Sequence, residues 1–353
     1  MGNLSITYQH IADILSFKSN NEQLKKTLSN EVFDWDAIVI EGSKHLVLPA
    51  IYCRLKSKQL THLLPEELDT YLKEITALNK QRNNQIISQI NTLSQLLISH
   101  KIEHVFLKGT ALISGGYYDD NAERMLGDID ILVANDQLDL AFKVLQNNSY
   151  YPIEQTLGND FFEHKHLPRL KTDNYICAVE LHRKLFISYK NKALSSSNIL
   201  LSKQFINTIA IPSQEHLLLH NILNYQINDY GSLYNSISFR SAYDSLVVLQ
   251  RNDSTITNIN SKIIRNYFNL LGIFFIDIPE KYRRKNFTTK FYNYKLRHLD
   301  FYKFWNKFIK VIHFLWIIIG RVPYFIKNKA YRTALLKDRK RIFSHIRSVL
   351  KNT

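Results

Sequence analysis

Residues 108–130 read KGTALISGGYYDDNAERMLGDID, and the last four residues carry the clearest chemical signal in the chain. They open an apolar segment, 127–133, that is typical of a strand. Because side chains alternate across a strand, the carboxylates of Asp128 and Asp130 leave the same face. Two negative charges on one face repel each other unless a cation lies between them. Since Mg²⁺ takes oxygen ligands and keeps open positions for phosphate, the pair predicts phosphoryl chemistry.

The segments around this strand predict a mixed α/β centre. In chain order, the expected elements are a strand at 104–107, a helix from 110 to 115, the strand at 127–133, a helix from 136 to 147 and strands at 161–170 and 175–182. Asp136 is expected to act as the N-cap of its helix. The last strand contains Glu180 and His182, two residues apart, so both side chains are expected on one face.

The flanks of this centre are predicted to be helical. Apolar residues at helical spacings indicate helices within 11–17, 35–40, 45–55, 66–99, 213–223 and 242–250. Pro65 sets the start of the longest one, and strand signals fade after Ser202. We therefore expect an α/β (α+β) protein with four regions: a helical N-terminal region (1–100), a catalytic core (101–200), a helical region (201–280) and a basic, aromatic-rich tail (281–353).

The small number of cysteines limits the kinds of disulfide and metal site that the chain can form, and it bears on the cellular compartment. Only Cys53 and Cys177 occur among the 353 residues, so neither a disulfide framework nor a cysteine-built zinc site is available. The first residues lack the basic and then apolar order of a secretory signal. We therefore expect a cytoplasmic protein.

The formal charge of +15 is concentrated at the C-terminal end. Residues 281–353 contain 20 Lys and Arg against two Asp, so the rest of the chain is slightly acidic. The unbroken apolar run in this region, 311–319, is much shorter than the roughly 20 residues that a membrane-spanning helix needs. A span is therefore not expected, whereas contact with an anionic membrane surface, contact with nucleic acid and a solvated structural tail all remain open.

Two further groups of polar residues have ordinary structural interpretations. His216, His220 and Asn224 share one face of a predicted helix, but the residues between the histidines supply no Glu that would act as a base beside a zinc ion. A structural role or a place in a substrate pocket is expected for them. Asp244 lies near Arg240 and Tyr243, and we expect it to cap or pair locally, with contact to a nucleotide as the less favoured alternative.

Four motifs together resemble a known family. They are Lys108-Gly109-Thr110, Arg124, Gly127-Asp128-Ile129-Asp130 and Val179-Glu180-Leu181-His182. In this order they resemble the bacterial uncharacterised nucleotidyltransferase family of the DNA polymerase β-type nucleotidyltransferase superfamily. The likeness covers about residues 40–250 and excludes the basic tail. It implies a polymerase β-like core with a mixed sheet.

The resemblance also implies roles for particular residues. Asp128, Asp130 and Glu180 would bind Mg²⁺ or Mn²⁺ and act as the catalytic carboxylates, with Glu180 also assisting as a general base. The implied nucleotide-binding residues are Lys108, Gly109, Thr110, Arg124 and His182. Gly109 and Thr110 stand where the superfamily opens a helix that holds the triphosphate, and Arg124 is placed for the pyrophosphate leaving group.

The implied reaction moves a nucleoside monophosphate from an NTP to an acceptor hydroxyl or phosphate and releases pyrophosphate. The acceptor stays open among a protein side chain, an RNA terminus and a sugar phosphate or polysaccharide precursor. The motifs are also similar to those of toxins that modify tRNA, an alternative that the basic tail favours. A second alternative is a binding module that holds a nucleotide without turnover. The tail would add an anionic membrane surface or RNA as a partner, with peripheral membrane association as a variant of the cytoplasmic location.

Overall fold

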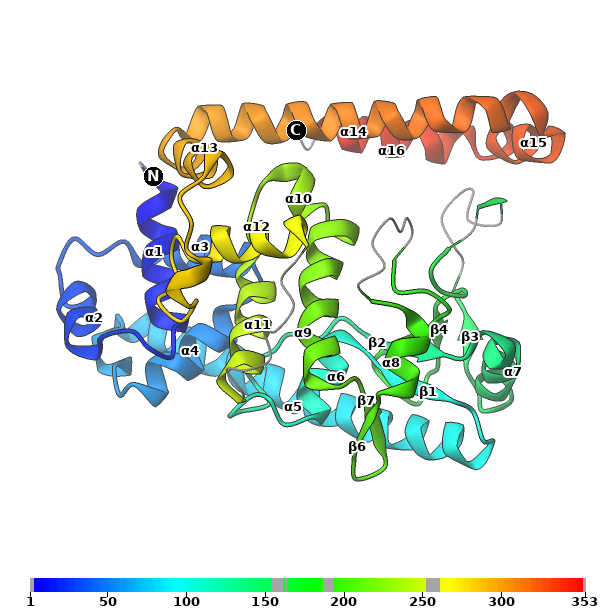
Figure 1. The fold of residues 1–353 in the computed structure, drawn as a ribbon, viewed down its shortest axis with the longest axis horizontal. Helices are drawn as coiled ribbons and strands as arrows, with labels where there is room; N and C mark the ends of the chain where they lie inside the picture. Colours follow the sequence, from blue (N-terminus) through cyan, green and yellow to red (C-terminus); the bar gives the residue numbers. More distant parts are fainter. Residues whose placement is uncertain (1–2, 154–160, 163, 187–193, 252–260, 352–353) are drawn as a thin grey trace.

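Figure 1 shows the fold in a computed structural model, which describes residues 3–153, 161–162, 164–186, 194–251 and 261–351. A mixed sheet lies between N-terminal and C-terminal helices, and one long helix, α14, runs lengthwise along one side of the molecule. The predicted mixed α/β fold class is confirmed. The division into four regions stays a prediction.

The N-terminal helices are α1 (Leu4–Leu15), α2 (Asn21–Leu28), α3 (Trp35–Lys44), α4 (Leu48–Ser57) and α5 (Glu66–Ser99), with the 3-10 turn η1 (Thr61–Leu63) before α5. Helix α5 has the predicted bounds. It starts after Pro65 and carries Glu66 and Glu67 in its first turn. Acidic side chains at this end interact favourably with the helix dipole. Its buried residues recur at helical spacings, including Leu72, Ile86 and Leu93, so one stripe of the helix enters the core.

The central sheet is built from β1 (His104–Phe106), β2 (Asp128–Val133), β3 (Tyr151–Pro152), β4 (Leu170–Lys171) and β5 (Ala178–His182), in the order β1-β2-β5-β4-β3. Strands β2 and β5 are parallel, and the other pairs are antiparallel. Helix α6 (Lys108–Ser114) follows β1 directly and contacts β2. The turn η2 (Asn135–Gln137) and helix α7 (Leu138–Asn147) connect β2 to β3.

The pairing register of β2 and β5 separates a polar face of the sheet from an apolar one. Asp130 lies opposite Glu180, so these side chains leave the same face of the sheet. The residues that alternate with them, Ile129, Ile131 and Val179, are fully buried on the other face. Apolar packing on that face fixes the register, because a slip of one residue would bury the carboxylates in the core.

Helices and a hairpin complete the part of the chain that the structure describes. They are α8 (Ser196–Leu201), β6 (Gln204–Ile206), β7 (Ile209–Ile211), α9 (Gln214–Leu223), the π-helical turn η4 (Asn224–Asn228), α10 (Gly231–Tyr234), α11 (Phe239–Arg251), α12 (Lys262–Leu271), the 3-10 turn η6 (Glu280–Tyr282), α13 (Phe287–Arg297), α14 (Leu299–Lys327), α15 (Lys329–Lys337) and α16 (Arg339–Lys351). Tyr292 and Leu296 of α13 belong to the hydrophobic core, although they lie in the basic region that begins at residue 281.

Three local predictions were wrong. In the expected strand 161–170, only Leu170 lies in a strand among the described residues, which do not include residue 163. Pro168 lacks a backbone N–H, and the segment forms a single bridge, from His166 to His182, before it reaches β4. Asp136 lies in η2, and the N-cap of α7 is Gln137, because the chain makes a 3-10 turn before the helix starts.

The third error is the hairpin of β6 and β7, which lies after the point where strand signals fade. Its turn contains Asn207 with a φ of 54°, a left-handed conformation that Asn tolerates better than most residues. Buried Ile209 and Ile211 belong to β7, which contacts β1. Asn207 between two Ile-containing segments was the signal that sequence reasoning missed.

Helix α14 is longer than the apolar run at 311–319 indicated. It has 29 residues, and it is the one helix in the described ranges that is long and apolar enough to cross a membrane. None of its residues is buried in the protein. Lys310 and Arg321, which flank the apolar run in the sequence, belong to the same continuous helix.

Candidate active site

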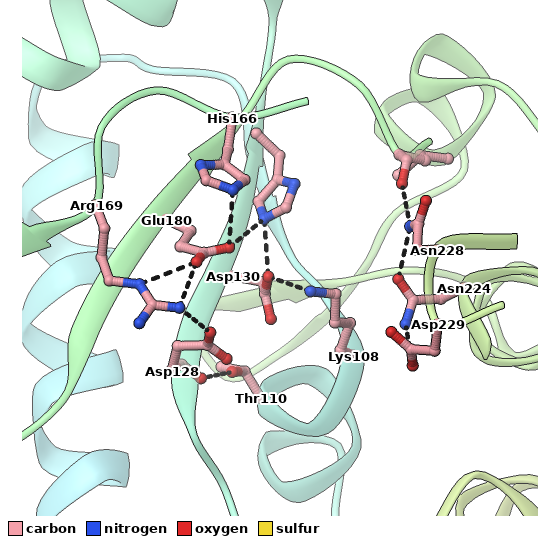
Figure 2. Close-up of polar contacts among 12 residues, drawn as sticks. Lys108, Thr110, Asp128, Asp130, His166, Arg169, Glu180, Asn224, Asn228 and Asp229 are labelled. Atoms are coloured by element: carbon pink, nitrogen blue, oxygen red, sulfur yellow. Dashed lines mark hydrogen bonds and ion pairs between the residues drawn. The ribbon is translucent and has the colours of Figure 1, made fainter. Parts of the chain in front are cut away.

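Acidic side chains from two neighbouring strands meet at the polar face of the sheet (Figure 2). Asp128 and Asp130 come from β2, and Glu180 and His182 come from β5. Asp130, Glu180 and His182 are buried, and one ligand atom of each lies within 4.8 Å of the others. The predicted alternation along both strands therefore places these four residues together, although they are about 50 positions apart in the sequence.

Lys108 stands at the junction between β1 and α6 and contacts Asp130. Its φ of 52° is left-handed, which is uncommon for a residue with a side chain and indicates local strain. The backbone N–H of Leu107 donates to the carbonyl of Asp130 at 2.9 Å, which holds the end of β1 against β2. The Lys108 amine lies 2.5 Å from Asp130 Oδ1. The tight junction thus places a cation directly beside a buried carboxylate.

The charge of Asp130 is balanced by two partners. Besides Lys108, His182 Nε2 lies 2.8 Å from Asp130 Oδ1. Burial by itself would raise the pKa of Asp130, but Lys108 and the hydrogen bond with His182 lower it well below its usual range. The carboxylate is therefore ionised at neutral pH. The other ring nitrogen of His182, Nδ1, is buried and has no hydrogen-bond partner among the described residues.

Glu180 has a different set of partners. Arg169 donates to Glu180 Oε1 from Nη2 at 2.7 Å and from Nε at 3.0 Å, while His182 and His166 lie 3.4 Å and 3.6 Å from Oε2. Burial opposes ionisation, but the hydrogen bond with His182, the charge of His166 and the hydrogen bond with Arg169 bring the pKa of Glu180 to about 2. Glu180 is thus a second ionised carboxylate beneath the surface.

Asp128 is the most exposed of the three carboxylates, with 28% of its side chain accessible. Arg169 Nη2 lies 3.0 Å from Asp128 Oδ2, so one guanidinium joins Asp128 to Glu180 (Figure 2). Burial, followed by the charges of Asp130 and Glu180, raises the pKa of Asp128. The three carboxylates therefore differ: the pKa values of Asp130 and Glu180 are lowered, whereas burial and the two neighbouring carboxylates outweigh Arg169 and Lys108 at Asp128.

Arg169 and His166 were not identified from the sequence. Arg169 precedes Leu170, which pairs with Val179 across the antiparallel β4–β5 pair, and this register turns Arg169 toward Glu180. The contact depends on a pairing between strands that the sequence did not predict. The sequence signal for Arg169 was a basic residue in the predicted strand 161–170, just before the strand that contains Glu180. Basic residues are common in surface strands, so this signal is not specific.

Gly109 and Thr110 lie in the first turn of α6, below the carboxylates. A Cβ added at Gly109 would lie 2.6 Å from Leu126 Cδ2 and 3.2 Å from Arg124 Nη2, so the site has no room for a side chain unless both neighbours move. Thr110 is buried, and its hydroxyl is 3.4 Å from the carbonyl of Asp128. Thr110 thus packs α6 against β2, and Gly109 packs it against the segment just before β2. The role of both residues in nucleotide binding stays a prediction.

The hydrogen bonds of Arg124 do not involve Asp128, Asp130 or Glu180. Its Nε donates to Asp244 Oδ1 at 2.9 Å and to Oδ2 at 3.1 Å, and its Nη1 donates to the carbonyl of Met125 at 2.5 Å. Tyr118 donates to the same Asp244 carboxylate at 2.6 Å. Asp244, for which local pairing was expected, therefore ties α11 to the segment that precedes β2. The described contacts give Arg124 a structural role, and its predicted contact with pyrophosphate is untested.

The histidines of α9 do not gather as metal ligands. Burial lowers the pKa of His220 to about 3, and the Nδ1 atom of His216 lies 2.7 Å from the hydroxyl of Ser202. Asn224 contacts Asn228 and Asp229 (Figure 2). Within the described ranges, the group of His, Cys, Asp and Glu that could hold a metal ion is Asp130, Glu180 and His182.

The donor set fits a divalent cation. Carboxylate oxygens are the ligands that Mg²⁺ prefers, and an imidazole beside two carboxylates also suits Mn²⁺. Asp130, Glu180 and His182 would hold the ion, with Asp128 next to them on β2. Two basic side chains, Lys108 and Arg169, already neutralise these carboxylates in the protein alone, which shows that the site stabilises positive charge.

A comparison with protein families gives a match over most of the chain. A model of the family described as "Uncharacterised nucleotidyltransferase" matches residues 31–264, which is more than half of the chain, so the chain belongs to this family. The resemblance inferred from the motifs is thereby confirmed. Membership supports a transferase that uses a nucleotide. A comparison with curated proteins found no match.

Proposed function

We propose that this chain, as a member of the uncharacterised nucleotidyltransferase family, moves a nucleoside monophosphate from an NTP to an acceptor hydroxyl or phosphate. The acceptor oxygen attacks the α-phosphorus, the bond from the α-phosphorus to the oxygen bridging to the β-phosphate breaks, and pyrophosphate leaves. The acceptor loses a proton when its group is a hydroxyl. Mg²⁺ or Mn²⁺ is the proposed cofactor.

The convergence of three carboxylates on one sheet face is the observation that carries this proposal. Asp128, Asp130 and Glu180 come from adjacent parallel strands, and two of them are buried. Buried carboxylates without a partner are strongly unfavourable, so a site that keeps several of them needs cations for balance. A metal-bound NTP brings both a cation for the carboxylates and an anion for the nearby basic groups.

A bound metal ion would polarise the phosphate oxygens and stabilise charge that develops during transfer. The residues of this chain have complementary tasks. Asp130 and Glu180 supply anionic oxygens, and His182, hydrogen-bonded to Asp130, orients that carboxylate. Among the described residues, Lys108 and Arg169 form ion pairs with these carboxylates, and the planar fork of Arg169 suits phosphate oxygens. We infer that these two side chains turn from carboxylates to phosphates when the substrate is bound.

Label transfer tests the reaction type. The purified protein is incubated with each NTP, labelled at either the α- or the γ-phosphorus, with Mg²⁺ or Mn²⁺ and with total RNA or a cell extract as acceptor source. The proposal expects α-label in protein, RNA or a small product and γ-label in pyrophosphate, with both lost in EDTA. RNA as the labelled product would favour the tRNA-modifying alternative.

Two outcomes contradict the proposal. Transfer of the γ-label to the acceptor would identify a kinase-type reaction instead. If no acceptor is labelled, calorimetry of NTP binding with and without Mg²⁺ decides between the remaining classes. Metal-dependent binding without turnover would support the non-catalytic module, and absence of binding by a folded protein would exclude a nucleotide site.

A further inference from the structure

Helix α14 presents an apolar face to the outside of the molecule. Seven of its exposed apolar residues recur at intervals of three and four, so they form one stripe along the helix, and Trp316, Ile317, Ile318 and Phe325 are exposed beside them. Each of the seven is between 44% and 66% exposed. We refer to these residues as the apolar stripe: Phe304, Phe308, Ile312, Leu315, Ile319, Val322 and Ile326.

The opposite face of α14 faces the rest of the protein. The ring of His313 lies 4.2 Å from that of Tyr230, just before α10, and the ring of Tyr324 lies 5.2 Å from that of Phe162. The guanidinium of Arg321 lies 4.9 Å above the Phe162 ring. These contacts use polar and amphipathic side chains. At its start the helix also packs the rings of Phe301 and Trp305 on Phe291 of α13. Beyond this start, α14 differs from an ordinary surface helix, which turns its apolar stripe inward.

Lysines also lie on the inward side of α14. A groove of about 360 Å³ lies between α14 and the region around α10, and its walls include Lys303, Lys307 and Lys310 together with Tyr234 and Ser236. The stripe itself contains no charged residue. The apolar and basic surfaces of α14 thus occupy different sides of one helix, and the long lysine stems allow their amines to reach the boundary between them.

We propose that the apolar stripe of α14 docks on an anionic lipid bilayer. Residues 281–353 carry 20 basic residues against two acidic ones, which matches the negative charge of such a surface. The indole of Trp316, 74% exposed beside the stripe, suits the interface between headgroups and acyl chains. A second copy docked on the stripe would bring two regions 281–353, each with a large excess of basic residues, close together. RNA would find no charge on the stripe itself, so neither partner complements this face as well.

The contacts of α14 favour a helix that lies in the plane of the bilayer over one that spans it. The helix is long and apolar enough to span by length and composition. However, Tyr302 near its start, His313 in its middle and Tyr324 near its end all contact the protein body or its core. A spanning helix would lose these contacts, whereas a helix lying flat keeps them and buries only its stripe.

Docking in this orientation would bring the bilayer near the segment that enters the active site. Phe161 and Phe162 contact Tyr331 of α15, and Phe162 also contacts α14. The same segment continues to His166 and Arg169, which contact Glu180. The bilayer proposal stands on the surface of α14 and does not require the proposed transferase reaction.

Flotation of the full chain with lipid vesicles tests the proposal. Vesicles of phosphatidylcholine are compared with vesicles containing one quarter phosphatidylglycerol. We expect binding to the anionic vesicles that is at least about tenfold tighter and that weakens as salt is raised. Alkaline carbonate should release the protein, because an interfacial helix is not anchored across the bilayer. Retention after carbonate would overturn the flat orientation.

A matched pair of double variants separates the stripe from general surface hydrophobicity. Leu315→Ser with Ile319→Ser removes two stripe residues, and Leu201→Ser with Ile206→Ser removes two exposed apolar residues elsewhere. We expect the stripe variant to lose about tenfold or more in vesicle affinity and the control to keep wild-type affinity. Thermal unfolding of both, measured without lipid, verifies that they fold.

Two further results would overturn the proposal. Equal vesicle binding by the two double variants would show that the stripe is not the docking face. A dimer in analytical ultracentrifugation that dissociates in the stripe variant, without vesicle binding by the wild type, would assign the stripe to a second copy. Fluorescence adds a local readout: the blue shift caused by vesicles should be largely lost in Trp316→Phe while binding is kept.

Discussion

The polar face of β2 and β5 and the outer face of α14 depart from the usual pattern of a soluble protein in opposite directions. The sheet buries charged side chains, including Asp130 and Glu180, while the helix exposes its apolar stripe. Charges on the sheet are balanced within the chain by Lys108, Arg169 and His182. The stripe stays about half exposed. Buried charges that are paired within the protein indicate a site that is held ready for a ligand. An exposed apolar stripe that no part of the protein covers indicates a surface whose partner lies outside the chain.

Variants of the two regions should therefore differ in their effects on activity and stability. Changes in the sheet face should alter both activity and stability, because each charged group there is a partner of another. Changes in the stripe should alter neither in the absence of lipid.

Asp130→Asn should have the largest effect. It removes the anion that Lys108 and His182 contact and that would bind the metal, so pyrophosphate release should fall by at least about a thousandfold, since metal stabilisation is worth several kcal/mol and each 1.36 kcal/mol is a factor of ten in rate. The exposed Asp136→Asn is the control and should keep wild-type turnover. Near-normal turnover of Asp130→Asn would reject the metal-site assignment.

Arg124→Ala should lower the free energy of unfolding by roughly 3 to 5 kcal/mol, because it leaves the buried Asp244 carboxylate without its cation. The matched control is Lys80→Ala, which breaks the exposed pair with Asp120 and should cost less than about 1 kcal/mol. Denaturant unfolding measures both variants. A stable Arg124→Ala protein with weakened NTP binding would instead support the predicted contact with pyrophosphate.

The free energy of unfolding should depend on pH through the protonation of the Glu180 carboxylate. Its folded pKa of about 2 lies below the ordinary glutamate pKa of 4.5, so its contribution to stability is present above pH 4.5 and is lost as the pH falls toward 2. The loss from this group should be roughly 3 kcal/mol, and Asp130 adds to it at lower pH. Glu180→Gln should be less stable than wild type at pH 7, and the difference should narrow on acidification.

Denaturant unfolding at several pH values between 7 and about 2 checks this, with the exposed Glu74→Gln in the interior of α5 as the control. The control should follow the wild-type curve throughout. A constant gap between wild type and Glu180→Gln at all pH values would mean that the Glu180 carboxylate is not stabilised by its neighbours.

The smallest effect is expected in the stripe. Ile319→Ala should change the free energy of unfolding by less than about 0.5 kcal/mol without lipid, since the side chain is 63% exposed. Ile131→Ala, in the fully buried face of β2, should cost about 2 to 5 kcal/mol. Thermal and denaturant unfolding of both variants measure the contrast. A large loss in Ile319→Ala would show that the stripe packs within the protein in solution.

Several elements were predictable because their signals are local. The spacing of apolar residues and the position of Pro65 gave α5, and alternation gave the shared face of Asp128 and Asp130 in β2. The predicted strand containing Glu180 was confirmed from Ala178 onward. In each case, the residues that carry the pattern are neighbours along the chain or along one helix.

The remaining features depend on residues that are distant in the sequence. The sequence by itself determined the fold family, the carboxylate strands and the basic character of the C-terminal region, since period, composition and motif order are properties of the chain. Only the tertiary structure decided that Arg169 bridges Asp128 and Glu180, that Arg124 pairs with Asp244, and which face of α14 is turned outward. Strand register and helix orientation follow from packing against the whole core, so no local pattern in the sequence encodes them.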